Sequence, residues 1–306
     1  MKIGFITSIL DGFDYPEVLD IAKKFDFKCL EVACWPQGKS ERRYAGVSHI
    51  DIDKVLDSDT YASEILDLSK KANIDISALA FYPNTLDPDL NKRSENVKHL
   101  IKVIKASAKL NVNLVTTFIG RDQSLNFEDN LLEVKKVWPS ILDEAKEQNV
   151  KVAIENCPML FSKEQWPGGQ NLMTSPRNWQ VILDLLNSDY LGINYDPSHF
   201  IWQMMDYIKP IYEFKDKIFH VHFKDIKILK DKLDNVGIMA YPLEFMSPKL
   251  PGLGDVDWGK FVSALNDIRY DGYACIEVED RAFEGSREKI IDSLELSRCY
   301  MNQFVI

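Results

Sequence analysis

Short, almost continuous apolar runs alternate with longer segments of helical spacing along the whole chain. Such runs are expected where both faces of a strand are buried, as they are in a parallel sheet. Eight strands are predicted at 2–7, 29–35, 76–84, 114–120, 151–157, 191–196, 218–225 and 273–279. Their regular alternation with helical segments predicts an α/β protein built from βαβ units.

The helical segments begin with capping signals. In the first, Asp14 is a candidate N-cap, with Pro16 near the first turn and Glu17 three residues after the cap. Further helices are predicted near 58–72, 88–110, 127–149, 175–187, 203–215 and 284–303, and one begins at Asp257. Eight strand–helix units in 306 residues predict a (β/α)8 TIM barrel, because an open doubly wound sheet usually has fewer units. Without a linker or composition break, one domain over 1–306 is expected.

Composition and charge argue against several classes of partner. The chain has a formal net charge of -10 and a sequence pI near 5.1. Since nucleic acids and anionic membrane surfaces require a basic face, neither is expected as a partner. No secretory signal and no apolar run of about 18 residues is evident. The five cysteines are scattered without CxxC pairing, which favours a reducing, cytoplasmic setting.

Polar residues end four consecutive strands in the second half of the chain. They are Glu155, Asp196, His222 and Glu277. In a barrel, the carboxyl ends of neighbouring strands meet at one mouth, and a charge within an apolar run is costly unless it is paired or binds a metal. Three carboxylates and one imidazole suit a single divalent ion. The mixed oxygen and nitrogen ligands favour Mn2+, with Co2+, Mg2+ and Zn2+ as alternatives.

Other residues at strand ends are candidates for binding a substrate. His199 lies just beyond the sixth strand, where it would contact substrate or orient a metal ligand. Lys224 shares the strand face of His222 and could hold a substrate oxygen or phosphate, with an ion pair to Asp225 as the alternative. Glu31 ends the second strand and is a candidate hydrogen-bonding partner of the substrate.

Aromatic residues could form the apolar walls of a small-molecule pocket, although ordinary packing is the simpler explanation for each one. They are Trp35, Tyr82, Phe118 and Trp166. Among the remaining histidines, His220 precedes His222 by two residues and is expected one layer beneath it. His49 is a candidate for covering the mouth, and His99 is expected on the surface.

The glycine-containing segment PGLGD at 251–255 lacks the residues of a P-loop or a dinucleotide-binding fingerprint. It follows the seventh strand, where barrels often bind phosphate. The substrate could therefore be either phosphorylated or unphosphorylated.

Four motifs resemble the xylose isomerase-like barrel superfamily: AIENCPMLFSKEQWPGG, NYDPSHFIWQ, HVHFKD and PGLGDVDW. The resemblance covers essentially the whole chain and is narrowest to the sugar phosphate isomerase/epimerase branch, which includes ketose 3-epimerases and inosose dehydratases. It implies that Glu155, Asp196, His222 and Glu277 bind the metal. It also implies that His199 contacts the substrate. Relatives that epimerise ketoses carry an arginine shortly after the ligand histidine, whereas this sequence reads KDIKILK, which leaves the sugar open.

The expected activity is isomerisation or epimerisation of a sugar or sugar phosphate. A proton next to a carbonyl would be removed to give a metal-bound enediolate, with Glu155 and Glu277 as the two catalytic bases. An inosose dehydratase-like lyase and an enzyme that cleaves a keto-glycoside share this first step, so the ligand set does not separate them. The expected partner is a small sugar or cyclitol, and a homo-oligomer stays open.

Two further classes are disfavoured. An endonuclease of abasic DNA would need more histidines than five and a basic groove. A non-catalytic sugar-binding barrel would not need a glutamate on each side of the metal.

Overall fold

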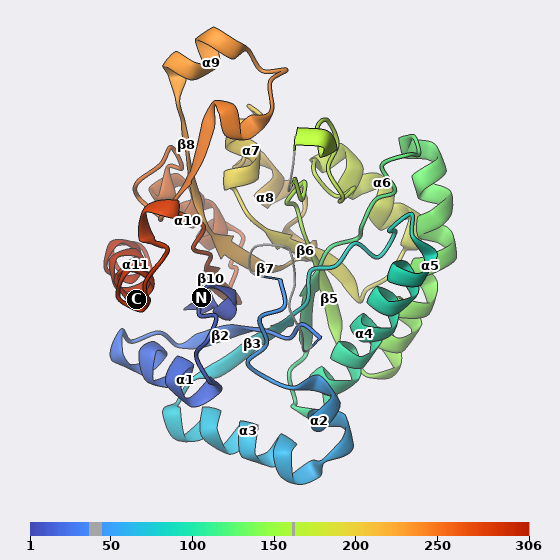
Figure 1. Cartoon of the computed structure of the whole chain (residues 1–306), viewed down its shortest axis with the longest axis vertical. Coiled ribbons are helices and arrows are strands. Elements are labelled where there is room, and N and C mark those ends of the chain that lie inside the picture. The colour runs from blue at the N-terminus through green and yellow to red at the C-terminus, as the bar shows by residue number, and fades with distance from the viewer. Residues whose placement is uncertain (37–44, 161–162, 306) are drawn as a thin grey trace.

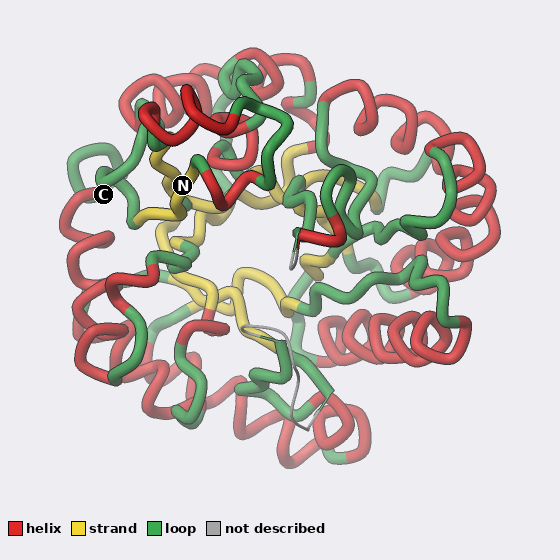
Figure 2. Tube along the Cα trace, turned by 45° about the horizontal axis from the view of Figure 1, so that its top comes forward, coloured by secondary structure: helices red, strands yellow, loops and turns green. Residues whose placement is uncertain are grey.

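Eight parallel strands close into a barrel. The computed structural model describes residues 1–36, 45–160 and 163–305, so residues 161–162 of the AIENCPMLFSKEQWPGG motif lie outside the described part. The strands pair in the circular order β1-β10-β7-β6-β5-β4-β3-β2, and Figure 2 shows them as an inner ring surrounded by helices. Their bounds are β1 Lys2–Ile6, β2 Cys29–Ala33, β3 Asp75–Ala80, β4 Leu114–Thr117, β5 Lys151–Glu155, β6 Leu191–Tyr195, β7 Ile218–Phe223 and β10 Tyr273–Ile276. The predicted (β/α)8 barrel is confirmed.

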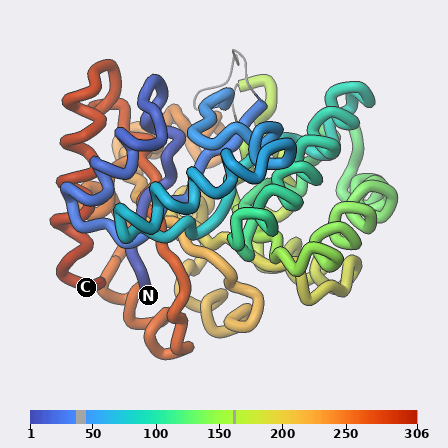
Figure 3. Tube along the Cα trace, turned by 90° about the horizontal axis from the view of Figure 1, so that it is seen from below, coloured from blue at the N-terminus to red at the C-terminus, as the bar shows by residue number. Residues whose placement is uncertain are grey.

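Helices form the outer layer, which is seen from below in Figure 3. The α-helices are α1 Tyr15–Lys24, α2 Ile52–Asp57, α3 Asp59–Ala72, α4 Leu90–Lys109, α5 Phe127–Glu147, α6 Pro176–Leu186, α7 Ser198–Trp202, α8 Lys209–Glu213, α9 Lys230–Val236, α10 Trp258–Asp267 and α11 Arg287–Met301. The short 3-10 helices are η1 Thr7–Ile9, η2 Lys163–Gln165, η3 Lys215–Lys217, η4 Pro242–Glu244 and η5 Arg281–Phe283. Because β1 pairs with β10 and α11 follows β10, the two termini lie near each other (Figure 1).

The capping signals read from the sequence are present. The Asp14 carboxylate accepts a hydrogen bond from the Glu17 backbone N–H at 2.8 Å, and the Glu17 carboxylate accepts one from the Asp14 N–H at 2.8 Å. These two bonds form a capping box at the start of α1. Ser175 caps α6 and Asp257 caps α10 through their side chains. Local sequence therefore fixes where these helices begin.

The continuous helix predicted at 203–215 is wrong. Of the two short α-helices here, α7 already ends at Trp202 and only α8 lies within this segment, with an irregular turn between the two. Met204 has a positive φ of 58°, which ends the helical path after α7. The carboxylate of Asp206 then accepts hydrogen bonds from the backbone N–H groups of Ile208 at 2.7 Å and Lys209 at 3.1 Å. After this turn, the chain forms α8, which runs in a different direction from α7.

A long excursion after β7 rises above the barrel mouth. It contains an antiparallel hairpin, β8 (Asp225–Ile228) and β9 (Met246–Lys249), with α9 and η4 between the two strands. Figure 1 shows α9 and β8 projecting at the top, away from the ring of outer helices. The excursion thus adds a wall at the carboxyl ends of the strands, where barrel enzymes carry their active sites.

The glycine-containing segment PGLGD wraps around a buried carboxylate of the chain itself. Asp225 accepts hydrogen bonds from the Gly252 N–H at 2.9 Å, the Val256 N–H at 3.1 Å and the Trp258 indole N–H at 2.9 Å. It also accepts from the Ile226 N–H at 2.8 Å. These donors are therefore used to anchor the excursion and do not support the phosphate-binding role considered for this segment.

The space between strands and helices is filled by large apolar side chains. Trp138, Trp179 and Trp258 are fully buried there, and each has a hydrogen-bond acceptor for its indole N–H. Burying a large apolar side chain contributes about 1.5–3 kcal/mol, so such residues hold the helices on the sheet. In the described part of the chain, no helix combines the length and the apolarity that crossing a bilayer requires.

Candidate metal centre and substrate cavity

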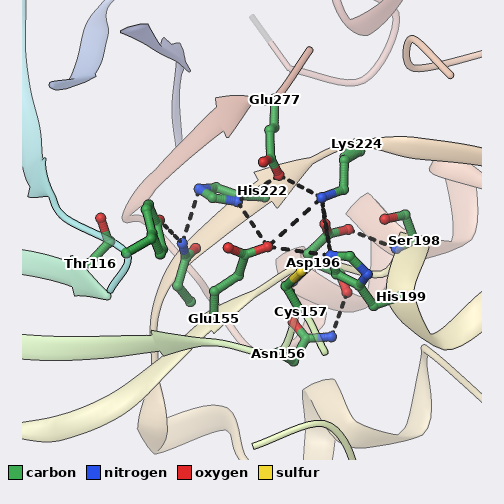
Figure 4. A network of polar contacts seen from close by, with 12 residues as sticks. Thr116, Glu155, Asn156, Cys157, Asp196, Ser198, His199, His222, Lys224 and Glu277 are labelled. Atoms are coloured by element: carbon green, nitrogen blue, oxygen red, sulfur yellow. Dashed lines mark hydrogen bonds and ion pairs between the residues drawn. The ribbon is translucent and has the colours of Figure 1, made fainter. Parts of the chain in front are cut away.

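Four side chains from the ends of neighbouring strands meet at the barrel mouth. We call Glu155, Asp196, His222 and Glu277 the acidic cluster. Each offers one ligand atom, and these four atoms lie within 4.8 Å of one another. Figure 4 shows the side chains pointing toward a common centre. Ligand atoms about 2.0–2.2 Å from one ion lie at most roughly 4.4 Å apart, so small adjustments would bring all four to a single cation.

Parallel pairing places these residues side by side. Glu155 ends β5 and is paired in register with Asn194 of β6, while His222 of β7 is paired with Cys275 of β10. Asp196 and Glu277 follow the last residues of their strands directly. The four parent strands are consecutive in the barrel order. The sequence spacing of the cluster therefore follows from barrel closure.

The backbone around Asp196 is fixed by its neighbours. The Asn156 side chain accepts from the Asp196 N–H at 2.8 Å and donates to the Asp196 carbonyl at 2.8 Å. The Ser198 N–H donates to Asp196 Oδ1 at 2.8 Å. One carboxylate oxygen is thereby used locally, and Oδ2 is left to face the cluster. Asn156 was not anticipated from the sequence, although its position directly after Glu155 was a usable signal.

A buried glutamate orients the imidazole of His222. The Glu31 side chain is fully buried, and its Oε2 lies 2.6 Å from His222 Nε2. Its other oxygen accepts from Thr116 Oγ1 at 2.6 Å and from the Tyr82 hydroxyl. Burial raises the pKa of Glu31, but the adjacent imidazoles of His222 and His220 lower it to about 2. Because Nε2 points at the Glu31 carboxylate, Nδ1 is the ring nitrogen that faces the cluster, 3.2 Å from Glu277 Oε2.

Three of the four ligand atoms are buried without a suitable partner. Among the described residues, no hydrogen bond of acceptable geometry reaches Glu155 Oε1, Asp196 Oδ2 or His222 Nδ1. Buried acceptors almost always have a hydrogen-bond partner. Three such atoms converging on one point form a donor set suited to a divalent cation. The residues present therefore fit the metal that was predicted from the sequence.

Lys224 faces the same centre. Its Nζ lies 2.8 Å from Glu277 Oε2, 2.9 Å from Asp196 Oδ2 and 3.8 Å from Glu155 Oε1. Burial lowers the pKa of Lys224, but the surrounding carboxylates, with Asp196 first, raise it well above its ordinary value. The ammonium thus offsets part of the cluster's negative charge and would compete with a metal for the same oxygens. The alternative role, an ion pair with Asp225, is not what the structure shows.

His199 also reaches the cluster. Its Nε2 lies 3.2 Å from Asp196 Oδ2, 3.4 Å from Glu155 Oε1 and 3.0 Å from Lys224 Nζ. The start of α7 immediately after β6 brings this ring over the two carboxylates. His199 and Lys224 together border the open side of the cluster, where they can bind substrate oxygens.

A cavity of about 460 Å³ opens over the acidic cluster. Glu155, His199, Lys224 and Glu277 line it, together with three of the aromatic residues expected there, Trp35, Tyr82 and Phe118. Two of the predicted substrate contacts lie elsewhere. Glu31 is beneath the cavity against His222, and Trp166 is beside Trp202, with its indole N–H donating to the Met239 carbonyl at 2.9 Å.

The other histidines have local partners. His220 is fully buried one layer beneath His222, and its two nitrogens lie 3.0 Å from Asn194 Oδ1 and 3.2 Å from Ser77 Oγ. His49 is buried, with Nε2 3.0 Å from the Leu10 carbonyl, and it does not line the cavity. The surface position expected for His99 is wrong, because α4 turns this ring inward onto the carbonyl of Cys34 at 2.9 Å.

These features place the protein among the (β/α)8 barrels with an acidic cluster at the mouth. The chain belongs to the family described as xylose isomerase-like TIM barrel, whose model matches residues 19–299.

Two relatives extend the comparison. The uncharacterized protein YfiH of Bacillus subtilis (strain 168) is 26% identical over 301 residues, covering 92% of this chain and 93% of that protein. An inosose dehydratase of Lactiplantibacillus plantarum (strain ATCC BAA-793 / NCIMB 8826 / WCFS1) is 22% identical over 243 residues, covering 78% of each chain.

Two solved structures share the fold. A D-psicose 3-epimerase determined in the presence of D-fructose superposes with a TM-score of 0.70 at 14% identity, covering 100% of this chain and 99% of that one. An IOLI protein with a bound zinc atom superposes with a TM-score of 0.70 at 17% identity, covering 99% of each chain. At these identities the likeness supports the fold.

Proposed function

We propose that this protein is a divalent-metal-dependent isomerase or epimerase of a small sugar, sugar phosphate or cyclitol. The observation that carries the proposal is the acidic cluster, whose four ligand atoms converge at the floor of a cavity. Among the described residues, three of these atoms accept no hydrogen bond of acceptable geometry. Membership of the xylose isomerase-like family and the structural likeness to a D-psicose 3-epimerase support it. The expected absence of a nucleic-acid partner and the expected cytoplasmic setting stay predictions.

The acidic cluster would hold the metal. When bound there, a divalent ion would polarise a substrate carbonyl and so acidify the neighbouring C–H bond. Mixed carboxylate and imidazole ligands favour Mn2+. The zinc atom in the IOLI structure makes Zn2+ a necessary member of any metal screen, together with Co2+ and Mg2+.

The proton transfers are assigned to Glu155 and Glu277. They lie on β5 and after β10, with β6 and β7 between them, and both line the cavity. One carboxylate takes the proton from the carbon next to the carbonyl, and the other delivers a proton from its own side. Delivery to the same carbon from the opposite face gives an epimer, whereas delivery to the former carbonyl carbon gives the isomer. Lys224 and His199 bind the substrate oxygens and hold the reacting carbon in place.

Solvent deuterium uptake into substrate tests this assignment. Metal-loaded wild-type protein should exchange the proton next to the carbonyl of its substrate, and Glu155→Gln and Glu277→Gln should each lower the rate by about 100-fold or more. The surface variant Glu128→Gln on α5 is the matched control and should exchange at the wild-type rate. Metal content is measured for each variant, so that loss of the ion is separated from loss of the base. Undiminished exchange in both metal-loaded variants would refute the two-base assignment.

A dehydratase is the second candidate, favoured by the similarity to an inosose dehydratase over 78% of the chain. The same first proton transfer would be followed by loss of the hydroxyl one carbon further on, and His199 or Lys224 would protonate it as it leaves. The product would carry a carbon–carbon double bond conjugated with the carbonyl. Its ultraviolet absorbance distinguishes dehydration from epimerisation in the same assay.

A further inference from the structure

We propose that the cavity over the acidic cluster has a subsite for an apolar substituent, so that the substrate is a keto-glycoside with an aromatic or aliphatic aglycone. This inference rests on the proposed function, because it places the reacting carbonyl of the sugar at the cluster. The inference concerns the part of the substrate that is attached to the sugar. The favoured substrate is therefore larger and less polar than a free ketose or cyclitol.

The first observation is the character of the cavity walls. Charged groups of the acidic cluster, with His199 and Lys224, form one part of the lining. Much of the remainder is apolar, and it includes Trp35, Leu160, Trp202, Pro242, Leu243 and Met246. A volume of about 460 Å³ lies within the range of roughly 300–1,000 Å³ that accommodates drug-sized ligands.

The second observation is that two insertions contribute much of this apolar wall. One is the loop after β5, which supplies Leu160, and the other is the excursion after β7, which supplies Leu243 and Met246. The insertions are joined to each other by the Trp166 indole N–H, which donates to the Met239 carbonyl at 2.9 Å. Figure 1 shows both segments on the same side of the barrel, above the strand ends. The wall is thus held by contacts between the insertions as well as by the barrel.

A free sugar suits this wall poorly. It carries a hydroxyl on nearly every carbon, and each hydroxyl that is buried without a hydrogen-bond partner costs about 1–3 kcal/mol. Apart from the cluster residues, His199 and Lys224, the polar residues that line the cavity are Ser8, Tyr82, Cys157, Tyr241, Glu279 and Arg281. The larger part of the lining is apolar. An aglycone instead places apolar surface against apolar side chains, which is favourable.

Trp202 supplies the third observation. It lines the cavity and is 6% exposed, and among the described residues its indole N–H has no hydrogen-bond partner. A buried donor without a partner is unusual in a folded protein. The oxygen that joins a sugar to its aglycone is an acceptor at the boundary between the polar and apolar halves of such a substrate. We assign the Trp202 N–H to that oxygen or to a neighbouring hydroxyl.

Calorimetric binding to the metal-loaded full chain tests the subsite, with methyl 3-keto-glucoside and phenyl 3-keto-glucoside as probes. The phenyl compound should bind about 10-fold or more tightly than the methyl compound, because its ring is removed from water. Leu243→Asn and Met246→Asn should each reduce this preference to about threefold or less. The control Leu132→Asn, an exposed leucine on α5, should leave the preference unchanged.

The outcomes separate the two proposals. Equal affinities for the two probes in the wild-type protein would overturn the subsite, and so would a preference that survives both Leu243→Asn and Met246→Asn. Since these are binding measurements, they do not depend on turnover. Failure of the proposed function is read independently, as absence of solvent deuterium uptake into every carbonyl sugar tested.

Discussion

At the residue scale, the acidic cluster depends on residues that would not touch the metal. Glu31 holds the His222 ring through its Nε2, while Asn156 and Ser198 fix Asp196 so that one oxygen faces the cluster. Carboxylate partners of ligand histidines fix the tautomer and the ring orientation, and their loss typically weakens metal binding 10- to 100-fold. The preorganisation of the site is therefore spread over residues that are not themselves ligands.

Replacing Glu31 with glutamine tests this dependence. Glu31→Gln keeps the shape of the side chain but removes the charge that holds the His222 Nε2–H, so the Kd for Mn2+ should rise by about 10-fold or more. The measurement is isothermal titration of the metal-free protein. Glu95→Gln, an exposed residue on α4, serves as the control and should bind as the wild type does. An unchanged Kd in Glu31→Gln would show that Glu31 does not position the ligand.

His49 predicts how stability responds to acid. Burial lowers its pKa more than the Leu10 carbonyl and the carboxylates of Asp11 and Asp14 raise it. The folded protein therefore keeps this ring neutral, while the unfolded chain takes up a proton near pH 6.5. Stability is fully present above that pH and is lost as the pH falls toward the lower pKa of the folded state.

Chemical unfolding at pH 7 and pH 5 measures this contribution. His49→Gln should flatten the loss of unfolding free energy on acidification by up to about 1.4 kcal/mol per pH unit. His99→Gln should act in the same direction, because burial also lowers the pKa of His99. An unaltered pH slope in both variants would contradict the neutral, buried state of these rings.

Much of the cluster follows from the sequence, because charged residues at the ends of apolar runs are conspicuous. The hydrogen-bond partners of those residues could not be predicted from the sequence in the same way. Glu31 was assigned to substrate because it was predicted to end the second strand, yet it lies in the middle of β2, beneath His222. Which of two strand-end carboxylates faces the mouth depends on the stagger of strands around the barrel, and sequence spacing does not give that stagger. Thr116 looks like an ordinary polar residue until the strands are paired, whereas the position of Asn156 directly after Glu155 was a signal that could have been used.

At the element scale, helices with strong caps were predicted well, and irregular segments were not. α1, α6 and α10 begin where their capping residues indicated. The segment 203–215 has helical spacing but contains a left-handed residue, Met204, whose conformation nothing in its side chain requires. The hairpin after β7 was not among the predicted strands, since its strands are half-exposed and pair only with each other.

Asp225 anchors this excursion, and its replacement should loosen it. In Asp225→Asn, an amide NH2 would face at least one of the donors that now point at the carboxylate, and leaving a buried donor unpaired costs about 1–3 kcal/mol. Urea denaturation should show a loss of unfolding free energy in that range. Asp234→Asn, on the exposed face of α9, is the control and should stay within about 0.5 kcal/mol of wild type. A wild-type midpoint for Asp225→Asn would contradict the anchoring role.

At the scale of the whole molecule, barrel closure explains why residues far apart in the chain form one site. Strands β5, β6, β7 and β10 are consecutive in the barrel, so polar residues at their ends converge wherever the intervening helices lie. This made the fold and the cluster predictable together. The cavity walls were less predictable, since part of them comes from two insertions whose contacts with each other depend on tertiary packing. The single domain over 1–306 stays a prediction.

Anomalous diffraction from crystals soaked in Mn2+ tests the central claim most directly. The account predicts one strong peak at the barrel mouth, with Glu155, Asp196, His222 and Glu277 as its protein ligands, His222 binding through Nδ1, and Lys224 Nζ displaced from the carboxylates. A crystal in which Lys224 keeps its contacts with Asp196 and Glu277 and no ion binds among them would contradict the account.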